Sequence, residues 1–408
     1  MRQAIYAWDY LEWGGAQIYL FSIIREAKDH FRVLVVLPAG SDPKLLRFLE
    51  DLGVEYYFFE GASDTKPQNG IFGRIRSRIK KIYAEYKMMR KIAELKPDGI
   101  IHLALLPHYS LLPLIWACLY AEVFISSHNR MPTVGRFRET IWKFKCAVIS
   151  RFRNFHIVCS NEDARKYFAG HYPKRTADLI KVAHTSVSFE EIAPVASDTS
   201  NRQRFRDLIG IGHDETTFLC VGNFIDRKGR WVFLEAARIA AAQDPSLRFV
   251  WLSPIGADDA AAERMISFGL GERFRLVLAD EIGRERADIL GFFMLADVFI
   301  LPSFVEGLPG ALLEAMALGL PVVSTDVNAI PEAVIHEKTG LLIRPGDAEE
   351  LAKHMLRLAA DKDLARELSL AGKQHVLENF EEKINAPKLL AAYKASLDTN
   401  ESKTLVTS

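Results

Sequence analysis

The sequence has few cysteines, and their spacing excludes a disulfide-stapled or zinc-ligated scaffold. The four are Cys118, Cys146, Cys159 and Cys220. They form no C-x-x-C pair and none of the short, even patterns found in small secreted domains. The N-terminal residues MRQAIYAWDY also lack the apolar segment of a secretory signal. We therefore expect a protein of the reducing cytoplasm.

Familiar nucleotide-binding motifs are absent too. There is no G-x-G-x-x-G, which argues against a nicotinamide-dependent dehydrogenase, and no Gly-Lys-Ser/Thr end of a P-loop. No DNA- or RNA-binding module is recognisable either. Nucleic acid is therefore not an expected partner.

Long uncharged runs are scarce. One of them, residues 103–121, holds no Asp, Glu, Lys or Arg and is long enough to cross a bilayer. It contains Pro107 and Pro113, and we interpret it as a buried strand followed by a helix. The net charge is zero, but residues 1–190 carry 28 basic and 19 acidic side chains (28 − 19 = +9), and the remainder balances this with −9. The basic first half suits an anionic acceptor or membrane.

What the sequence does contain is a regular alternation of short apolar strands and helices. Strands such as RVLVVLP (32–38) and DVFILPS (297–303) are rich in β-branched residues, and this alternation is typical of parallel sheets in α/β proteins. One helix has clear limits, with Asp42 as N-cap, Pro43 in the first turn and Gly53 just past the end. We predict an α/β protein with two tandem Rossmann-like, doubly wound domains and an interdomain cleft.

The domain limits follow from length and composition. A chain of 408 residues exceeds one ordinary core, and residues 190–204 are polar and aperiodic, which is typical of a linker. We predict an N-terminal domain at 1–190 and a second domain at 191–375. Residues 376–408 are predicted as a C-terminal helix that crosses back to the N-terminal domain.

One stretch, PSFVEGLPGALLEAMALGLPVVST (302–325), places two acids around a turn that opens a helix. Glu306 follows a buried strand, and Glu314 stands about one turn into the helix that begins near Pro309. A helix N-terminus at the carboxyl edge of a parallel sheet attracts anions. Two acids at such a place suggest carboxylates that accept hydrogen bonds from hydroxyl groups. The alternative is that Glu314 only favours the helix dipole, which is worth ~0.3–1 kcal/mol.

Two further segments suggest contact with phosphate. In VGNFIDRKGR (221–230), Arg227 and Lys228 gather where a helix starts, and cations beside a helix N-terminus favour a bound anion. Gly14 and Gly15 follow the first strand, and glycines allow a backbone to approach phosphate closely. A solvated basic turn and an ordinary tight turn remain the alternative interpretations.

Taken together, these residues resemble the retaining GT-B glycosyltransferases of family 4, also described as glycosyl transferases group 1. The resemblance extends over most of the chain. It is strongest in LPSFVEGLPGALLEAMALGLPVVSTDVNAIPEAVIHEKTGLLIRPGD, within residues 297–348. It implies an acceptor-binding N-terminal domain and a nucleotide-sugar-binding C-terminal domain.

The resemblance also implies roles for single residues. Glu314 corresponds to the glutamate that binds the nucleotide ribose, and Glu306 to the catalytic-site glutamate beside the donor sugar. Lys228 corresponds to the lysine on the diphosphate. The loop formed by Gly307, Leu308, Pro309 and Gly310 corresponds to the segment whose backbone amides contact sugar and phosphate, although Pro309 has no N–H to offer.

Other positions complete the implied site. VFISSHNR (123–130) is similar to the strand that ends in the family's active-site histidine, which makes His128 the second catalytic candidate. Gly14 and Gly15 correspond to the glycine-rich loop. Asn223 stands where the family has an arginine, and Arg227 is the candidate to replace that cation.

The resemblance implies transfer of a sugar from a UDP- or GDP-linked donor to a glycan or lipid-linked acceptor, in cell-surface polysaccharide or lipopolysaccharide synthesis. No metal or other cofactor is expected. The alternatives are a nucleotide-sugar epimerase of the same fold and a degenerate protein that binds donor without catalysis.

A basic helix over Arg74–Lys91 indicates a second kind of partner. Its apolar residues Ile75, Ile79, Ile82, Tyr86 and Met89 form a helical stripe. Basic amphipathic helices suit an anionic membrane surface, so the protein is expected to be peripheral at the inner face of the membrane. The alternative is a core helix with a solvated basic face.

Overall fold

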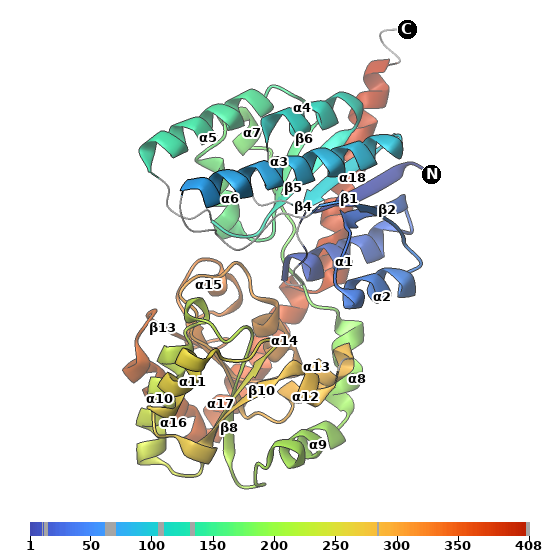
Figure 1. Ribbon diagram of the computed structural model, residues 1–408. Coiled ribbons are helices and arrows are strands. Elements are labelled where there is room, and N and C mark those ends of the chain that lie inside the picture. Colours follow the sequence, from blue (N-terminus) through green and yellow to red (C-terminus); the bar gives the residue numbers. More distant parts are fainter. Residues whose placement is uncertain are drawn as a thin grey trace. The chain divides into compact units, whose positions relative to one another are not determined.

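The computed structural model describes residues 1–9, 11, 15–61, 71–104, 110–130, 135–283 and 285–404. The chain divides into two compact units. Met1–His184 and Lys383–Ser408 form the first unit, and Thr185–Glu382 form the second. Each unit is a parallel sheet covered by helices (Figure 1).

The first unit is built on a parallel sheet in the order β3-β2-β1-β4-β5-β6-β7, with seven strands in the described part of the chain. Its elements are β1 (Gln3–Ala7), α1 (Gly15–Ala27), β2 (Arg32–Pro38), α2 (Pro43–Asp51), β3 (Glu55–Phe59), α3 (Ile71–Glu94), β4 (Ile100–Ala104), α4 (Leu111–Tyr120), β5 (Glu122–Ser127), α5 (Arg136–Ile149), β6 (Phe155–Cys159), α6 (Glu162–Ala169), α7 (Lys174–Ala177), β7 (Lys181–Val182) and α18 (Glu382–Thr404).

The second unit has the sheet order β10-β9-β8-β11-β12-β13. Its elements are α8 (Phe189–Ser197), α9 (Ser200–Ile209), β8 (Thr216–Val221), the 3-10 turn η1 (Asp226–Lys228), α10 (Arg230–Gln243), β9 (Leu247–Ser253), α11 (Asp259–Ile266), the 3-10 turn η2 (Gly271–Arg273), β10 (Phe274–Leu278), α12 (Ala279–Ile282), α13 (Arg286–Phe293), β11 (Val298–Leu301), α14 (Gly310–Leu318), β12 (Val322–Thr325), α15 (Ile330–Ala333), β13 (Leu341–Ile343), α16 (Ala348–Ala360) and α17 (Lys362–Asn379).

The order of the strands reverses between β1 and β4 in the first sheet and between β8 and β11 in the second. In open α/β sheets, ligands bind beyond the carboxyl ends of the strands at such a reversal. The loop that carries Glu306 follows β11, and the turn that carries Arg227 and Lys228 follows β8. Both therefore lie at the position in the second sheet where a ligand is expected.

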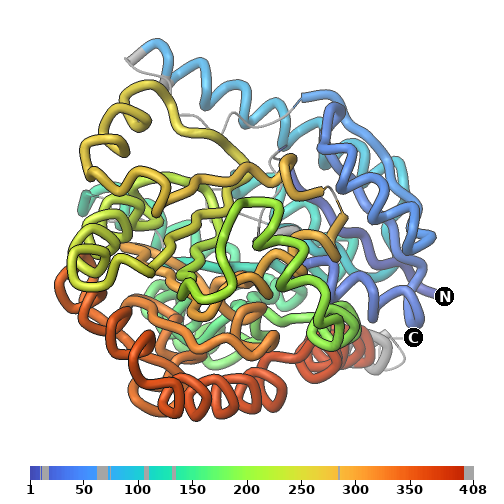
Figure 2. The backbone as a smooth tube through the Cα atoms, turned by 90° about the horizontal axis from the view of Figure 1, so that it is seen from below, coloured from blue at the N-terminus to red at the C-terminus, as the bar shows by residue number. Residues whose placement is uncertain are grey.

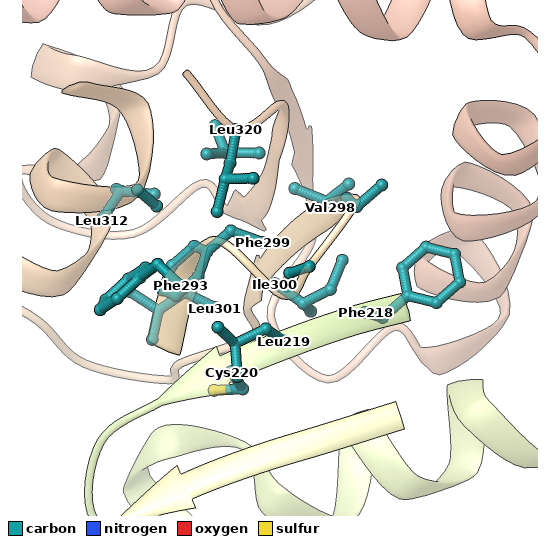
Figure 3. Packing of buried hydrophobic residues seen from close by; sticks show 14 of the residues in the cluster. Phe218, Leu219, Cys220, Phe293, Val298, Phe299, Ile300, Leu301, Leu312 and Leu320 are labelled. Atoms are coloured by element: carbon teal, nitrogen blue, oxygen red, sulfur yellow. The ribbon is translucent and has the colours of Figure 1, made fainter. Parts of the chain in front are cut away.

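The core of the second unit explains why its strands read as continuous apolar runs. Side chains of β8, β11 and α14 gather in one packed cluster, in which Phe218, Phe299 and Leu312 are completely buried (Figure 3). A sheet that is covered on both faces needs apolar residues at successive positions rather than at alternate ones. This packing fixes the carboxyl ends of β8 and β11 beneath the loops that carry the candidate site.

The expected helix limits at α2 are confirmed. Asp42 is the N-cap and accepts a hydrogen bond from the backbone N–H of Lys44 at 2.8 Å, and Pro43 begins the helix. Gly53 adopts a φ of +67° just past the end, a conformation that glycine accepts without strain. Residues 103–121 contain the end of β4 and all of α4. Within the described residues, no helix is long and apolar enough to cross a membrane.

The prediction of a linker at 190–204 is wrong. This segment lies in α8 and α9, which pack on the second unit through Ile192, Val195 and Phe205. Arg206 is also buried and donates hydrogen bonds to the backbone carbonyls of Leu295 and Glu215. These few contacts stabilise helices whose sequence is too polar and too short to show a clear period.

The last helix, α18, belongs to the first unit. It lies beside β1 in both views of the chain (Figures 1 and 2). Leu389, Leu390 and Tyr393 of α18 share a buried cluster with Tyr6 of β1. The boundaries between the two units lie between His184 and Thr185 and between Glu382 and Lys383. The sequence predicts these boundaries at residues 190 and 375.

Candidate functional site

The loop after β11 is held in place by hydroxyl groups of the neighbouring strand. Ser324 Oγ donates to the carbonyl of Leu301 at 2.8 Å, and Thr325 Oγ1 donates to the carbonyl of Ser303 at 2.6 Å. All four residues are buried. The chain then turns through residues 304–309 and enters α14. These bonds give the loop a rigid base, as a binding site requires.

The N-terminus of α14 is open to a ligand. Pro309 occupies the N-cap position without a side-chain cap, and the helix begins at Gly310. The first N–H groups of a helix have no carbonyl partner within it, and the helix dipole adds partial positive charge there. A Cβ atom built on Gly310 meets nothing within 4 Å, so the first turn borders open space. This end of α14 therefore offers backbone donors to an anion.

Glu306 lies at the centre of a charged cluster beside this helix end. Its side chain is buried. Lys228 Nζ lies 2.5 Å from Oε1, and Arg227 Nη1 lies 3.6 Å from Oε2. Ser303 Oγ donates to Oε1 at 2.7 Å. The backbone N–H of Glu306 donates to Asn328 Oδ1 at 3.3 Å.

The turn η1 places Lys228 by a close approach between two loops. Gly229 has a φ of +77°, and a Cβ atom built on it would lie 2.0 Å from the carbonyl oxygen of Pro302. Only glycine allows the backbone after β8 to come this near to the backbone after β11. Phe304 N–H also donates to the carbonyl of Arg227 at 2.9 Å. The two loops are thus joined directly, and Lys228 is directed at Glu306.

Arg230, the third cation of the basic turn, serves a local role. Its Nε lies 2.8 Å from Asp226 Oδ1, and its Nη1 donates to the carbonyl of Phe224 at 3.0 Å. Its guanidinium also stacks on Trp231. Arg227 and Lys228 therefore face Glu306, while Arg230 stabilises the start of α10.

Glu314 lies one helical turn further along α14, buried among apolar neighbours. Its Oε1 forms an ion pair with Arg286 Nη2 at the start of α13. Arg286 Nε lies 3.2 Å from Glu191 Oε2 of α8. Burial lowers the pKa of Arg286, but the two carboxylates raise it by more, so the net direction is upward. Arg286 thus stays charged and orients Glu314.

The charges of this site suit a ligand that is both anionic and rich in hydroxyl groups. Arg227, Lys228 and Glu306 together carry one net positive charge, and the open end of α14 adds partial positive charge. Glu314 is an acceptor on the same helix. A phosphate group fits the positively charged region formed by these residues and the end of α14. A diol fits Glu314, because a carboxylate accepts hydrogen bonds from two hydroxyls.

The first unit holds the other catalytic candidate, His128, directly after β5. The ring packs edge-on against Tyr19 with a centroid distance of 4.8 Å, and its buried Nε2 has no hydrogen-bond partner within the described part of the chain. Its backbone carbonyl accepts from Asn161 Nδ2 at 2.8 Å. Burial lowers the pKa of His128 to about 4, so the imidazole is neutral at pH 7.

A fully buried histidine, His102, lies close by. His102 Nε2 and Ser126 Oγ are 2.5 Å apart, and His102 Nδ1 bonds the hydroxyl of Tyr393. Burial and then the nearby His128 lower the pKa of His102 to about 3. Tyr393 belongs to α18, so this polar network ties the last helix to strands β4 and β5.

Partly buried His128 and fully buried His102 predict how the stability of the first unit depends on pH. Both have folded-state pKa values below the unfolded value of about 6.5. The unfolded chain therefore binds more protons between pH 6.5 and 4, and stability falls as the pH falls through this range. We expect each histidine to remove about 2 kcal/mol at pH 5 relative to pH 7.

Denaturant unfolding followed at pH 7 and pH 5 measures this loss. The variant His128→Asn should reduce the pH dependence by about half, because one of the two titrating groups is gone. Equal stability of the first unit at the two pH values would contradict the assigned burial.

The remaining predicted site residues are placed as follows. Gly14 lies outside the described residues, and Gly15 is the first residue of α1. Asn223 is exposed in the loop after β8. Gly307 lies in the loop between β11 and α14, Gly310 begins α14, and Leu308 packs its side chain into the core. The sequence missed Arg286, Ser303, Asn328 and Asn161, because single polar residues outside a motif carry no signal until the fold brings them together.

Among the described residues, no group of three or more His, Cys, Asp or Glu side chains could hold a metal ion.

Known proteins resemble this chain most clearly in the second unit. Residues 215–361 match the family model described as glycosyl transferases group 1. This segment contains Lys228, Glu306 and Glu314. In these residues the chain is similar to the group 1 glycosyltransferases.

Curated proteins match this chain over part of their length. The amylovoran biosynthesis glycosyltransferase AmsK of Erwinia amylovora is 33% identical over 188 residues, which cover 44% of this chain and 44% of that protein. The putative colanic acid biosynthesis glycosyltransferase WcaL of Salmonella typhimurium is 32% identical over 171 residues, which cover 40% and 41%. The aligned region thus spans less than half of these relatives.

Solved structures match over nearly the whole chain. The structure of Anabaena HepE in complex with UDP and glucose has a TM-score of 0.75 at 17% identity and covers 97% of this chain and 99% of that one. A glycosyltransferase from Rickettsia africae has a TM-score of 0.77 at 16% identity and covers 97% and 98%. At such identities the likeness shows the fold. The prediction of two Rossmann-like domains of the GT-B type is thereby confirmed.

Proposed function

We propose that the protein is a retaining glycosyltransferase that moves a sugar from a UDP- or GDP-linked donor to a glycan or lipid-linked acceptor. The single observation that carries the proposal is the cluster around Glu306. There two cations, a buried carboxylate and an uncapped helix N-terminus meet at the reversal point of the second sheet. Such a cluster fits the diphosphate and the sugar hydroxyls of one ligand.

The proposed reaction needs little more than stabilisation of charge. When the glycosidic bond breaks, negative charge develops on the diphosphate leaving group, and preorganised cations and N–H donors stabilise it. Lys228 and the N-terminus of α14 supply these donors. Arg227 lies beside them and replaces the arginine that the resembled family has at the position of Asn223. Glu306 accepts from donor sugar hydroxyls, and Glu314 accepts from the ribose. We expect the transfer to proceed without a metal ion.

His128 is proposed as the catalytic residue that the first unit supplies. Its neutral imidazole can accept or donate one hydrogen bond through Nε2, for which the described residues supply no partner. A neutral ring avoids repelling the oxocarbenium-like centre that forms as the bond breaks. The first unit is proposed to bind the acceptor, and its basic surface suits a phosphate-bearing, lipid-linked molecule at the inner face of a membrane.

The named relatives support a role in cell-surface polysaccharide or lipopolysaccharide synthesis. AmsK and WcaL are named for amylovoran and colanic acid biosynthesis, and the glycosyltransferase WaaG, a structural neighbour with a TM-score of 0.67, is named for lipopolysaccharide biosynthesis. An epimerase of the same fold, or a protein that binds donor without turnover, remains the alternative.

Transfer of labelled sugar tests the proposal. The protein is incubated with UDP- and GDP-linked sugars, with and without lipid-linked oligosaccharide, and the released nucleoside diphosphate and the product anomer are measured. The proposal predicts release that depends on acceptor and a product that keeps the anomeric configuration of the donor. Conversion of the donor into an isomeric nucleotide sugar without acceptor indicates an epimerase, and binding with neither release nor conversion indicates a non-catalytic protein.

Arg286 gives a separate prediction about nucleotide binding. The variant Arg286→Met leaves buried Glu314 without its cation, and we expect about tenfold weaker binding of the nucleoside diphosphate because a charged hydrogen-bond partner is worth ~1.5–3 kcal/mol. The loss should grow as the pH falls, since an unpaired buried carboxylate takes up a proton more readily. Calorimetric titration at two pH values measures both effects.

The matched control is Arg275→Met, which removes an exposed ion pair with Glu281 at 3.5 Å. An exposed pair contributes little, so this variant should bind as the wild type does. The conservative variant Arg286→Lys should restore part of the affinity. Equal binding by Arg286→Met and the wild type would show that Arg286 does not position Glu314.

A further inference from the structure

Helix α3 does not bury the apolar stripe that its sequence shows. Of the five stripe residues, only Met89 is buried, at 7% exposed. The others lie open to solvent: Ile75 at 51%, Ile79 at 62%, Ile82 at 50% and Tyr86 at 58%. The contacts of α3 with the core are made by Ala84, Met88, Met89 and Ile92 instead. The alternative of an ordinary core helix with a solvated basic face therefore fails for Ile75, Ile79, Ile82 and Tyr86, which make up most of the stripe.

Helices α4 and α5 extend this apolar surface. The three helices contribute to one core cluster and lie together on one side of the first sheet (Figure 1). Each of the three helices carries large apolar side chains that are exposed to solvent. We call the following set the apolar–basic face: Phe72, Ile75, Ile79, Ile82, Tyr83 and Tyr86 of α3, Leu112, Leu119 and Tyr120 of α4, and Phe137, Ile141 and Phe144 of α5.

Basic residues alternate with these apolar residues. On α3 they include exposed Arg76, Arg78 and Lys80, and on α5 they include Arg136, Arg138 and Lys143. Between Arg74 and Lys91 the one acid is Glu85. Its side chain is buried and accepts from the backbone N–H of Ser110 at 3.1 Å. The exposed surface of α3 is thus positively charged.

The mixture of Phe, Ile and Tyr with many Lys and Arg indicates which kind of partner binds the apolar–basic face. Protein interfaces are depleted of lysine at their centre. A second copy of α3 would bring two positive surfaces together, although the spacing of Phe72, Ile75, Ile79, Ile82 and Tyr86 resembles a heptad seam. A bilayer surface with anionic lipids accepts both kinds of side chain, because apolar groups enter the acyl boundary and basic groups remain at the headgroups.

We propose that the apolar–basic face of α3, α4 and α5 inserts into the surface of an anionic membrane. This deepens the peripheral location put forward above and rests on that part of the proposed function. The aromatic residues Phe72, Phe137 and Phe144 supply apolar area, and the arginines and lysines around them pair with lipid phosphates. The helices lie in the interface and do not span it, in keeping with the absence of a spanning helix among the described residues.

Co-sedimentation of the full chain with vesicles tests the proposal. One set of vesicles is pure phosphatidylcholine, and the other also contains phosphatidylglycerol. The aromatic variant combines Phe72→Ser, Phe137→Ser and Phe144→Ser, and the basic variant combines Arg76→Gln, Arg78→Gln, Arg136→Gln and Arg138→Gln. The control combines Ile266→Ser and Leu370→Ser, which remove equally exposed apolar side chains (76% and 63%) from the second unit.

The proposal predicts binding that depends on the anionic lipid and that the control retains. The basic variant should lose about fivefold in partition coefficient for each arginine removed, and the aromatic variant should lose tenfold or more in total. Each variant should still bind nucleoside diphosphate as the wild type does, so a failure here is separable from a failure of the donor site.

Two results would overturn the proposal. The first is a failure in co-sedimentation. Either the wild type does not bind anionic vesicles, or the aromatic and basic variants sediment with them as well as the control does. The second is a dimer in lipid-free solution that the aromatic variant converts to monomer, which would assign the face to a second copy of the chain. Sedimentation velocity without vesicles detects that dimer.

Discussion

Replacing Lys228 by methionine is expected to lower kcat/KM for sugar transfer by about 10²–10³, because one preorganised charge at the leaving group is lost. Lys228 Nζ lies 2.5 Å from buried Glu306, and a turn that contacts the next loop holds it in place. The side chain therefore undergoes little rearrangement when the diphosphate arrives. Initial rates with saturating acceptor measure the effect.

Two controls make this result specific. Lys228→Arg keeps the positive charge but changes the length and geometry of the side chain. It should therefore retain more activity than the methionine variant. Lys338→Met removes an exposed lysine of the same unit and should leave the rate unchanged. A Lys228→Met enzyme with normal kcat/KM would mean that the leaving group is stabilised elsewhere.

Replacing Gly229 by alanine is expected to destabilise the second unit by about 3 kcal/mol or more. The substitution combines a positive φ, which costs an L-residue roughly 1–2 kcal/mol, with a Cβ atom 2.0 Å from the carbonyl oxygen of Pro302. Backbone atoms cannot move aside as a flexible side chain can, so the two loops must separate. Denaturant unfolding of the second unit reports the loss.

The matched control for this variant is Gly210→Ala. Gly210 also has a positive φ, at +71°, but a Cβ atom there meets nothing within 4 Å. It should therefore show only the conformational cost of roughly 1–2 kcal/mol. If Gly229→Ala were no more destabilising than Gly210→Ala, the loops after β8 and β11 would not be in the close contact described above.

Much of the fold could be predicted from the sequence because it rests on local patterns. Runs such as RVLVVLP and DVFILPS fall on β2 and β11, and the capping residues Asp42 and Pro43 mark the start of α2. At the site, the positions of Glu306 and Glu314 relative to β11 and α14 follow from the spacing of a strand, a turn and a helix start. These features depend on neighbours in the chain.

The rest depends on contacts between residues far apart in the sequence. Arg286 gains its place only because α13, α14 and α8 bring it between Glu314 and Glu191. The segment 190–204 is helical because the second unit buries a few of its side chains. The stripe of α3 has a core-like period, yet four of its five residues are exposed. Periodicity shows that a face is apolar, and the surrounding structure decides what covers it.

The most direct test of the account is a calorimetric titration of the wild type and the Lys228→Met variant with UDP and with GDP. The account predicts that one of these nucleotides binds the wild type and that Lys228→Met weakens that binding about tenfold or more, since a hydrogen bond from a charged group is worth ~1.5–3 kcal/mol. No binding by the folded wild type, or equal binding by the two proteins, would contradict a donor site at the carboxyl ends of β8 and β11.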